Sequence, residues 1–270
     1  MVPRIVRFMA CAILAMGMAP AFADATAFLS DQKGDLKLDG GARPPLLAEL
    51  LPGSRLDLAA GAMAAVMYIV SGEEYQLKGP GEFVVGRDSV TARKGAAPSR
   101  RQPAIKPDGG AVIRVSRAAS ASLRLRSTAS APAAAAIHPQ GRIVDPSPVV
   151  RYPGTESKAT VTVMAIGGTE RFRGDLKSGA RLPVRLEPGQ SYAWTVRAGD
   201  RELAHGQFEV LPAADVDAAE KARRAARSFG DRVRWALLLE SLGAPADARE
   251  AWSALAAERP DLPELSLLAR

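Results

Sequence analysis

Residues 24–95 alternate between apolar and polar side chains over short stretches. Leu56 and Leu58 have charged neighbours, and Tyr75 and Leu77 repeat the pattern after a glycine-containing turn. Side chains of a strand point alternately to the two faces of a sheet, and turn signals every 8–12 or so residues separate short strands. The pattern predicts a small all-β domain over 24–95.

Apolar and polar side chains alternate more strongly in residues 143–212 than in 24–95. The predicted strands have their apolar positions at Val161 and Val163; at Leu182, Val184 and Leu186; at Tyr192, Trp194 and Val196; and at Phe208 and Val210. Hydrophobic side chains on one face of each strand indicate a small antiparallel β-sandwich. Trp194 shares a face with Tyr192 and Val196, which predicts that it is a core residue.

After Pro212 the apolar spacing changes to three or four residues, which is typical of amphipathic helices. The predicted helices run from a cap at Asp215 or Asp217 to about Ser228, from just after Asp231 to Gly243, from Pro245 to just before Pro260, and from Asp261 through Leu265 and Leu268. The predicted fold is therefore mainly β with a C-terminal α segment at 213–270, which contains a helical hairpin.

The first 23 residues have the pattern of a secretory signal peptide. Arg4 and Arg7 precede an apolar run over 8–18, and Ala21-Phe22-Ala23 fits the small-x-small cleavage rule. We expect cleavage after Ala23 and a periplasmic protein without a transmembrane helix in the mature chain. The alternative, an uncleaved membrane anchor, is disfavoured because the apolar run is short for a bilayer.

Cysteine and histidine usage limits the possible chemistry. The only cysteine, Cys11, lies in the leader, and the two histidines, His138 and His205, lie in unrelated contexts. We therefore expect no disulfide, no metal site and no cofactor.

The positive charge is concentrated in one segment. The chain has a formal net charge of +7, and residues 93–126 alone contain nine basic residues against Asp108. Residues 96–142, rich in alanine, proline, serine and arginine, are predicted to be a basic connector with room for edge strands. Its candidate partner-binding side chains are Arg100, Arg101, Arg117, Arg124 and Arg126. An exported protein is not expected to bind nucleic acid, so an anionic cell-wall polymer is the alternative to a merely solvated linker.

Within 24–95, four motifs resemble the FecR-like periplasmic domain. They are Lys33-Gly34-Asp35-Leu36, Leu51-Pro52-Gly53-Ser54-Arg55-Leu56, Gly61-Ala62-Met63-Ala64 and Tyr75-Gln76-Leu77-Lys78-Gly79-Pro80. The resemblance implies a β-rich domain of short strands and a role in envelope sensing. Only seven residues precede the apolar run of the leader, so the sigma-factor-binding segment of the transmembrane regulators in that family is not expected here.

Two further resemblances concern the later segments. Residues 189–196 resemble a late strand of an immunoglobulin-like or fibronectin type III-like domain. Residues 229–262 resemble one tetratricopeptide repeat, with matching residues at Ala236, Leu239, Gly243, Ala248, Trp252 and Pro260, although Trp235 and Leu255 depart from the motif. A single repeat cannot bury its apolar face, so either the flanking helices or another protein must cover it.

This resemblance leads to a hypothesis for partner binding by the tail. Trp252 occupies the large aromatic position of the repeat and is expected in the core. The concave side of the helix over 231–242, with Arg234 and Glu240, is the predicted partner surface.

No catalytic constellation is apparent in the sequence. Glu73 and Glu74 are adjacent on a predicted strand and point to opposite faces, so solvation is their expected role. We therefore expect a non-enzymatic periplasmic binding or scaffold protein that contacts envelope proteins. The alternative is a module that binds peptidoglycan or an anionic polysaccharide, and an exported hydrolase has no supporting residues.

Overall fold

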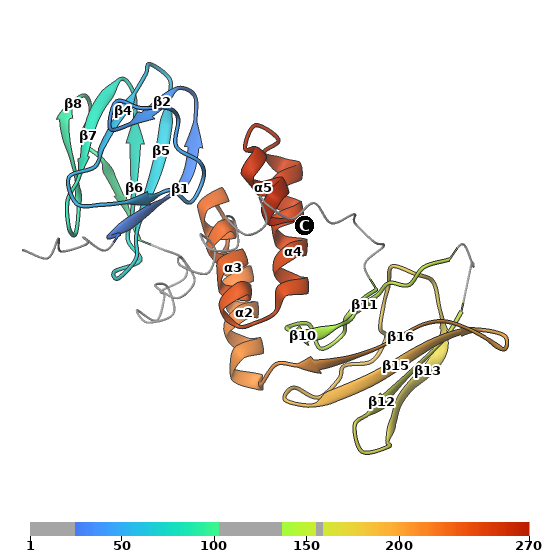
Figure 1. The fold of residues 1–270 in the computed structure, drawn as a ribbon. Coiled ribbons are helices and arrows are strands. Elements are labelled where there is room, and N and C mark those ends of the chain that lie inside the picture. The colour runs from blue at the N-terminus through green and yellow to red at the C-terminus, as the bar shows by residue number, and fades with distance from the viewer. Residues whose placement is uncertain (1–24, 103–136, 155–158, 270) are drawn as a thin grey trace, which may run out of the picture.

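Two β-domains lie on either side of a group of helices in the computed structural model, which describes residues 25–102, 137–154 and 159–269 (Figure 1). The architecture is mainly β with a C-terminal helical segment, as the sequence predicts. The predicted leader and three connector arginines, Arg117, Arg124 and Arg126, fall outside the described residues.

The first β-domain contains two facing antiparallel sheets. Their strand orders are β3-β1-β5-β6-β9 and β2-β4-β7-β8. The strands are β1 (Ala27–Lys33), β2 (Leu36–Leu38), β3 (Glu49–Leu50), β4 (Arg55–Leu58), β5 (Met63–Tyr68), β6 (Glu74–Lys78), β7 (Gly81–Val85), β8 (Val90–Lys94) and β9 (Ser99–Arg101). Leu56, Leu58, Leu77 and Phe83 are buried between the sheets, on the side that the sequence alternation predicts.

The sheet β3-β1-β5-β6-β9 is buried on its outer face as well. On β5, Ala64 and Val66 pack into the domain's own core, whereas Met67 belongs to a second cluster shared with the helices. A continuous apolar run is typical of a strand that is covered on both faces. The unbroken apolar run at 62–70 is thus a sequence signal for this cover, although the sequence analysis did not use it.

The second β-domain is built on the sheet β10-β16-β15-β12-β13, with the two-stranded sheet β11-β14 beside it. The strands are β10 (Gly141–Ile143), β11 (Val149–Val150), β12 (Ala159–Ala165), β13 (Glu170–Leu176), β14 (Ala180–Arg181), β15 (Ser191–Ala198) and β16 (Arg201–Val210). Trp194 is 1% exposed, which confirms it as a core residue, and its indole N–H donates to the Pro139 carbonyl at 2.8 Å.

One predicted strand is much shorter than the sequence indicated. Alternation over 181–186 predicts a full strand, but pairing stops after β14 at Arg181. Pro183 has no backbone N–H to donate to a ladder. Leu182 and Leu186 are nevertheless buried, so the alternation correctly identified the apolar face but not the hydrogen bonding.

Four helices occupy the C-terminal part of the described chain. They are α2 (Ala213–Ala225), α3 (Phe229–Ser241), α4 (Pro245–Glu258) and α5 (Pro263–Leu268). The first begins two residues before Asp215 and has no side-chain cap, so the predicted cap there is wrong. The next helix, α3, is capped by Ser228, whose hydroxyl accepts from the Asp231 N–H while the Asp231 carboxylate accepts from the Ser228 N–H. This capping box stabilises the start of α3.

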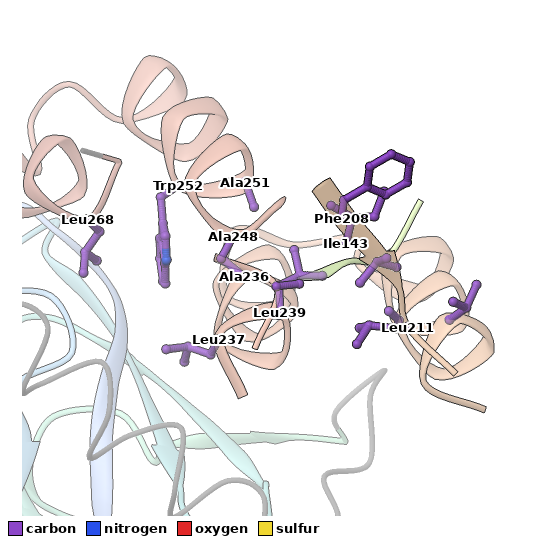
Figure 2. Close-up of a cluster of buried hydrophobic side chains, with 14 of the residues drawn as sticks. Ile143, Phe208, Leu211, Ala236, Leu237, Leu239, Ala248, Ala251, Trp252 and Leu268 are labelled. Atoms are coloured by element: carbon purple, nitrogen blue, oxygen red, sulfur yellow. The ribbon is translucent and has the colours of Figure 1, made fainter. Parts of the chain in front are cut away.

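The helices join the two β-domains through a hydrophobic cluster. Phe28 and Met67 enter it from the first β-domain, Ile143 and Phe208 from the second, and Trp252 from α4. Figure 2 shows part of this cluster, where side chains of α3 and α4 lie beside β10 and β16. The apolar stripe of the helical hairpin is therefore covered by the neighbouring β-domains as well as by α2 and α5. None of the helices in the described ranges has the length and apolar composition needed to cross a membrane.

Part of the predicted connector belongs to the folded β-domains. Arg100 and Arg101 lie in β9, which pairs with β6, and β10 pairs with β16. Paired strands are thus present at both ends of the segment 96–142, while its candidate strands at 112–115 and 123–126 lie outside the described residues.

Limited digestion of the native protein with trypsin should spare the bonds after Arg100 and Arg101. Proteases need an extended, unpaired segment, and the β9 backbone is hydrogen-bonded to β6 while the Arg101 side chain is held by α3. Arg101→Gln should speed cleavage after Arg100 several-fold, whereas Arg93→Gln on the other sheet should not. Mass spectrometry of the first fragments measures this, and equal rates in all three proteins would show that β9 is not anchored.

Candidate functional site

The candidate site lies where the outer face of the sheet β3-β1-β5-β6-β9 meets the start of α3. Pairing of β9 with β6 places Arg101 opposite Glu74. The capping box of α3 places Ser228 and Asp231 beside the same arginine. Local strand pairing and local helix capping thus bring together residues that are more than 120 positions apart in the chain.

Two arginines and two acids form a network at this junction. The Arg101 guanidinium donates to Glu74 Oε1 at 3.2 Å, to Ser228 Oγ at 2.6 Å and to the Asp231 carboxylate. On the other side, Arg234 Nη2 lies 3.8 Å from Glu74 Oε2 and donates to the Gly72 carbonyl at 2.9 Å. We call Glu74, Arg101, Asp231 and Arg234 the junction network.

The junction network is almost dry. The side chains of Glu74, Asp231 and Arg234 are 3%, 0% and 7% exposed, and that of Arg101 is 28% exposed. Removing one member of a buried ion pair leaves its partner as an uncompensated charge, which is strongly destabilising. The network therefore holds the first β-domain and α3 in a defined register.

Burial and charge act in opposite directions on the pKa values of the network. Burial of Asp231 favours the neutral acid, but hydrogen bonds from the Ser228 backbone and from Arg101 outweigh it and lower the pKa of Asp231. Burial of Arg101 is likewise outweighed by Asp231 and Glu74, so the pKa of Arg101 is raised. For Arg234 burial dominates, and its pKa is lowered despite the attraction of Glu74 and Asp231.

Arg259 forms a second attachment between the helices and the first β-domain. Its guanidinium donates to Asp31 Oδ1 at 2.8 Å and to the Gln32 carbonyl, and it also binds Asp261. The same group lies 5.2 Å from the ring centroid of Phe229, a cation–π geometry. Hydrogen bonds to Asp261 and Asp31 outweigh burial and raise the pKa of Arg259.

A cavity of about 260 Å³ lies beside these two attachments. Residues of the sheet, including Asp31, Lys33 and Glu74, form one wall, and Ser228 and Gly230 at the start of α3, with Arg259, form the other. Glu74 Oε2 is buried and has no hydrogen-bond partner. This oxygen lies inside the packed junction, 3.8 Å from Arg234 Nη2.

Gly230 allows α3 to approach this carboxylate. A Cβ atom at Gly230 would lie 2.8 Å from Glu74 Oε2, which is closer than real Cβ contacts. Gly230 belongs to α3, where alanine would be the better helix former. The glycine thus lets Glu74 Oε2 pack directly against the start of α3.

Of the residues predicted to contact a partner, Arg101 and Arg234 instead hold the chain's own domains together. Arg234 was expected on an open concave surface, but the first β-domain covers that face of α3. Glu240 is half-buried, and Arg100 is exposed and pairs with Glu73.

Glu74 is the site residue that the sequence reasoning missed. It was assigned to the solvated surface together with Glu73, but its residue exposure is 2%. Glu74 begins β6 and Glu73 precedes it, and the two acids pair separately with Arg101 and Arg100 of β9. The missing step was to recognise, from the apolar run on the neighbouring β5, that the outer face of this sheet is covered.

A second junction joins α4 to the second β-domain. The Val144 N–H donates to Asp247 Oδ2 at 2.8 Å, and Arg142 donates to the Leu242 carbonyl at 3.0 Å. His138 belongs to the predicted connector 96–142, but it is buried. Its backbone forms an isolated antiparallel β-bridge with that of Arg151. Burial and the nearby Arg151 lower the pKa of His138 to about 4, so its ring is neutral at pH 7.

Asp247 gives this junction a pH dependence. Burial, with Asp145 and Glu250 nearby, raises the pKa of Asp247 to about 6 even though the Val144 N–H opposes the shift. Between about pH 4 and pH 6 the folded carboxyl therefore binds a proton that the unfolded one does not. The ionised carboxylate is thus destabilising at neutral pH, and this penalty fades as the pH falls.

Asp247→Asn should accordingly stabilise the protein at pH 7.5 by about 2 kcal/mol, with the difference largely gone at pH 4.5. Asparagine retains an oxygen that can accept from Val144. The exposed Asp217 on α2 offers the control Asp217→Asn, which removes a carboxylate without touching the junction. Urea unfolding at several pH values measures both differences, and a pH-independent effect of Asp247→Asn would show that this carboxyl is not buried.

No family profile and no curated protein sequence matches this chain. Within the described ranges, no three histidine, cysteine, aspartate or glutamate side chains are grouped as metal ligands. The junction network and its cavity are therefore interpreted from their own geometry.

Proposed function

We propose that this chain is a non-enzymatic periplasmic protein that serves as a binding scaffold for other proteins of the cell envelope. The leader-like residues 1–23 support export. The resemblance of 24–95 to the FecR-like periplasmic domain, and of the helical hairpin to a tetratricopeptide repeat, supports a role in protein–protein contacts.

The observation that carries this proposal is the hydrophobic cluster shared by both β-domains and the helices. Domains of one chain usually move relative to each other unless their interface is large and apolar. A chain that fixes two β-domains through a helical unit presents one composite surface to a partner. Such a surface suits a scaffold, because pre-organisation lowers the entropy lost on binding.

Two experiments on the mature protein test export and partner binding. The intact mass of the protein from the periplasm should begin at Asp24, and immobilised 24–270 should retain envelope proteins in stoichiometric amounts from a detergent extract. Variants with substitutions on the surface shared by the two β-domains and the helices should no longer retain these envelope proteins. A species that retains Met1 and fractionates with membranes would contradict periplasmic export, and retention of nothing above a blank resin would contradict the scaffold.

A hollow on the outer face of the sheet β2-β4-β7-β8 favours the polymer-binding alternative. It measures about 580 Å³ and is lined by Arg55 and Arg93, whose side chains are 43% and 65% exposed. Arg55 pairs with Asp57 and Arg93 with Glu82 at this surface. Exposed ion pairs are weak, so both arginines can still bind carboxylate or phosphate groups of a wall polymer. Co-sedimentation with murein sacculi that is abolished by Arg55→Gln with Arg93→Gln, but not by Arg201→Gln, would favour this alternative.

A further inference from the structure

The strand β13 forms a free edge of the second β-domain. In the sheet order β10-β16-β15-β12-β13 its one neighbour among the described strands is β12, and none of its seven residues is buried. The opposite edge strand, β10, packs against α4, so β13 ends the sheet on the side away from the helices (Figure 1). An edge strand has backbone N–H and C=O groups that another strand can bind.

Hydrogen bonds at the end of β12 show which of its residues bond to β13. The Ala165 N–H donates to the Thr169 carbonyl at 2.8 Å, towards β13, whereas the Ile166 N–H donates to the Ser191 carbonyl at 2.9 Å, towards β15. Successive residues of a central antiparallel strand bond alternately to its two neighbours, and β12 keeps one register with β15 over 160–165. The odd-numbered residues of β12 therefore bond to β13.

This alternation places two charged residues of β13 at the free edge. Val161 is the odd-numbered partner of Gly174, so Gly174 uses its backbone groups within the sheet. Its neighbours Arg173 and Asp175 lie opposite even-numbered residues of β12, and their N–H and C=O groups point away from β12. Both residues are exposed, and they are therefore accessible to a further strand.

The sequence around Gly174 is complementary to itself. It reads Phe172-Arg173-Gly174-Asp175-Leu176. When two copies pair antiparallel about a two-fold axis at Gly174, Arg173 of each copy lies opposite Asp175 of the other, and Phe172 lies opposite Leu176. Phe172 and Leu176 are partly buried at the margin of the hydrophobic cluster. The pairing thus covers apolar surface on one face of the sheet and matches opposite charges on the other.

We propose that β13 is a dimerisation edge, at which a second copy of this chain binds through its own β13. Arg173 of each copy exchanges backbone hydrogen bonds with Asp175 of the other, and the two five-stranded sheets become one continuous sheet. The inference concerns contacts between copies of the chain and does not depend on the envelope partners proposed above.

The charges favour one register of this pairing and oppose its neighbours. A slip that keeps the same backbone groups bonded moves one strand by two residues. Such a slip places either Arg173 or Asp175 opposite the same residue of the second copy, and like charges directly opposite each other are destabilising. Charged side chains on an edge usually prevent indiscriminate strand pairing. On β13 their order also selects a copy of the same strand.

The existing partners of these charges leave them available. Arg173 binds Glu170 of its own strand at 2.8 and 2.9 Å, but the two side chains are 63% and 43% exposed, and exposed ion pairs are weak. The Thr160 hydroxyl donates to Oδ1 of Asp175 at 2.8 Å. This bond uses one of the two carboxylate oxygens, so Asp175 retains capacity for an arginine of the second copy.

Sedimentation velocity of mature 24–270 tests the proposal. Because one pair of edge strands buries little surface, we expect a reversible monomer–dimer equilibrium at about 0.01–1 mM protein. Asp175→Arg places two arginines opposite each other on both sides of the axis, and Arg173→Asp does the same with two aspartates. Each should weaken the dimer about tenfold or more. Asp200→Arg, the same charge change at the exposed turn between β15 and β16, should leave the dimer unchanged.

Complementary combinations of these substitutions identify the register. The double variant, Arg173→Asp with Asp175→Arg, restores opposite charges across the axis and should dimerise as the wild type does. An equimolar mixture of the two single variants should form a mixed dimer, because every arginine of one strand then faces an aspartate of the other. Circular dichroism and thermal unfolding show whether each variant folds, and the double variant keeps the test decisive if one single variant does not.

Two results would overturn the proposal. One is a wild-type protein that stays monomeric throughout the concentration range. If Asp175→Arg then also abolishes retention of an envelope protein, β13 binds a strand of that protein instead of a second copy. The other is a dimer whose strength neither single substitution changes, which would place the contact on another surface. A monomeric wild type that still captures envelope proteins leaves the scaffold proposal intact, so the two failures are distinguishable.

Discussion

Trp252→Ala is expected to lower the free energy of unfolding by about 3–5 kcal/mol, the usual cost of removing a large buried aromatic side chain. Trp252 is 0% exposed and lies on α4 in the cluster that joins the helices to both β-domains (Figure 2). Its loss leaves a cavity in the middle of the apolar stripe of the hairpin. Urea unfolding followed by circular dichroism measures the change.

Trp235 on α3 is the matched control for this substitution. It is partly buried and packs at the edge of the same cluster, so Trp235→Ala should cost clearly less. Equal losses for the two substitutions, or a cost below about 1 kcal/mol for Trp252→Ala, would mean that the hairpin is not the packed centre of the protein.

The second large effect is expected for Arg234→Ala, which should destabilise the protein by about 2–4 kcal/mol. Among the described residues, the substitution leaves the buried Glu74 carboxylate with Arg101 as its remaining cationic partner, and it removes the hydrogen bond to the Gly72 carbonyl. Arg234 Nε also donates to the Met67 sulfur at 2.7 Å, and the substitution removes this contact as well. The estimate lies below the full cost of breaking a buried pair because Arg101 remains.

Arg232 on the same helix provides the control for Arg234. It pairs with Glu258, and their side chains are 36% and 47% exposed, so Arg232→Ala should cost less than about 1 kcal/mol. Replacing the buried pair as a whole, with Glu74→Gln and Arg234→Met together, should recover most of the stability lost in Arg234→Ala. If Arg234→Ala and Arg232→Ala cost the same, the junction network does not form.

The sequence predicted individual elements better than their assembly. The period-two positions identified the inward faces of β4, β6 and β15, and the change of period after Pro212 located the four described helices to within a few residues. One prediction failed where alternation over 181–186 indicated a full strand. Pro183 lacks a backbone N–H, and the strand pairing of β14 stops before it. Likewise, α3 begins at Phe229 after a Ser228 cap, whereas the sequence analysis placed its start just after Asp231, which is instead the third residue of the helix.

The junction network shows why the candidate site was harder to predict. Arg101 and Asp231 are 130 positions apart, and no local pattern signals that they meet. Each residue looks like an ordinary surface charge in its own segment, because long-range pairing is decided by how whole elements pack. The apolar run at 62–70 was the available clue to a covered sheet face, but it does not specify which segment covers it.

The central claim is that the helices hold the two β-domains in a fixed arrangement, and a distance measurement between the domains tests it most directly. Residues 24–270 contain no cysteine, so spin labels can be placed at Ser89→Cys in the first β-domain and Lys177→Cys in the second, both exposed positions. A pair within the first β-domain, Ser89→Cys with Lys37→Cys, gives the width expected for a rigid body. The account predicts one narrow inter-domain distance distribution of comparable width. A broad distribution, as for two domains moving on a tether, would contradict it.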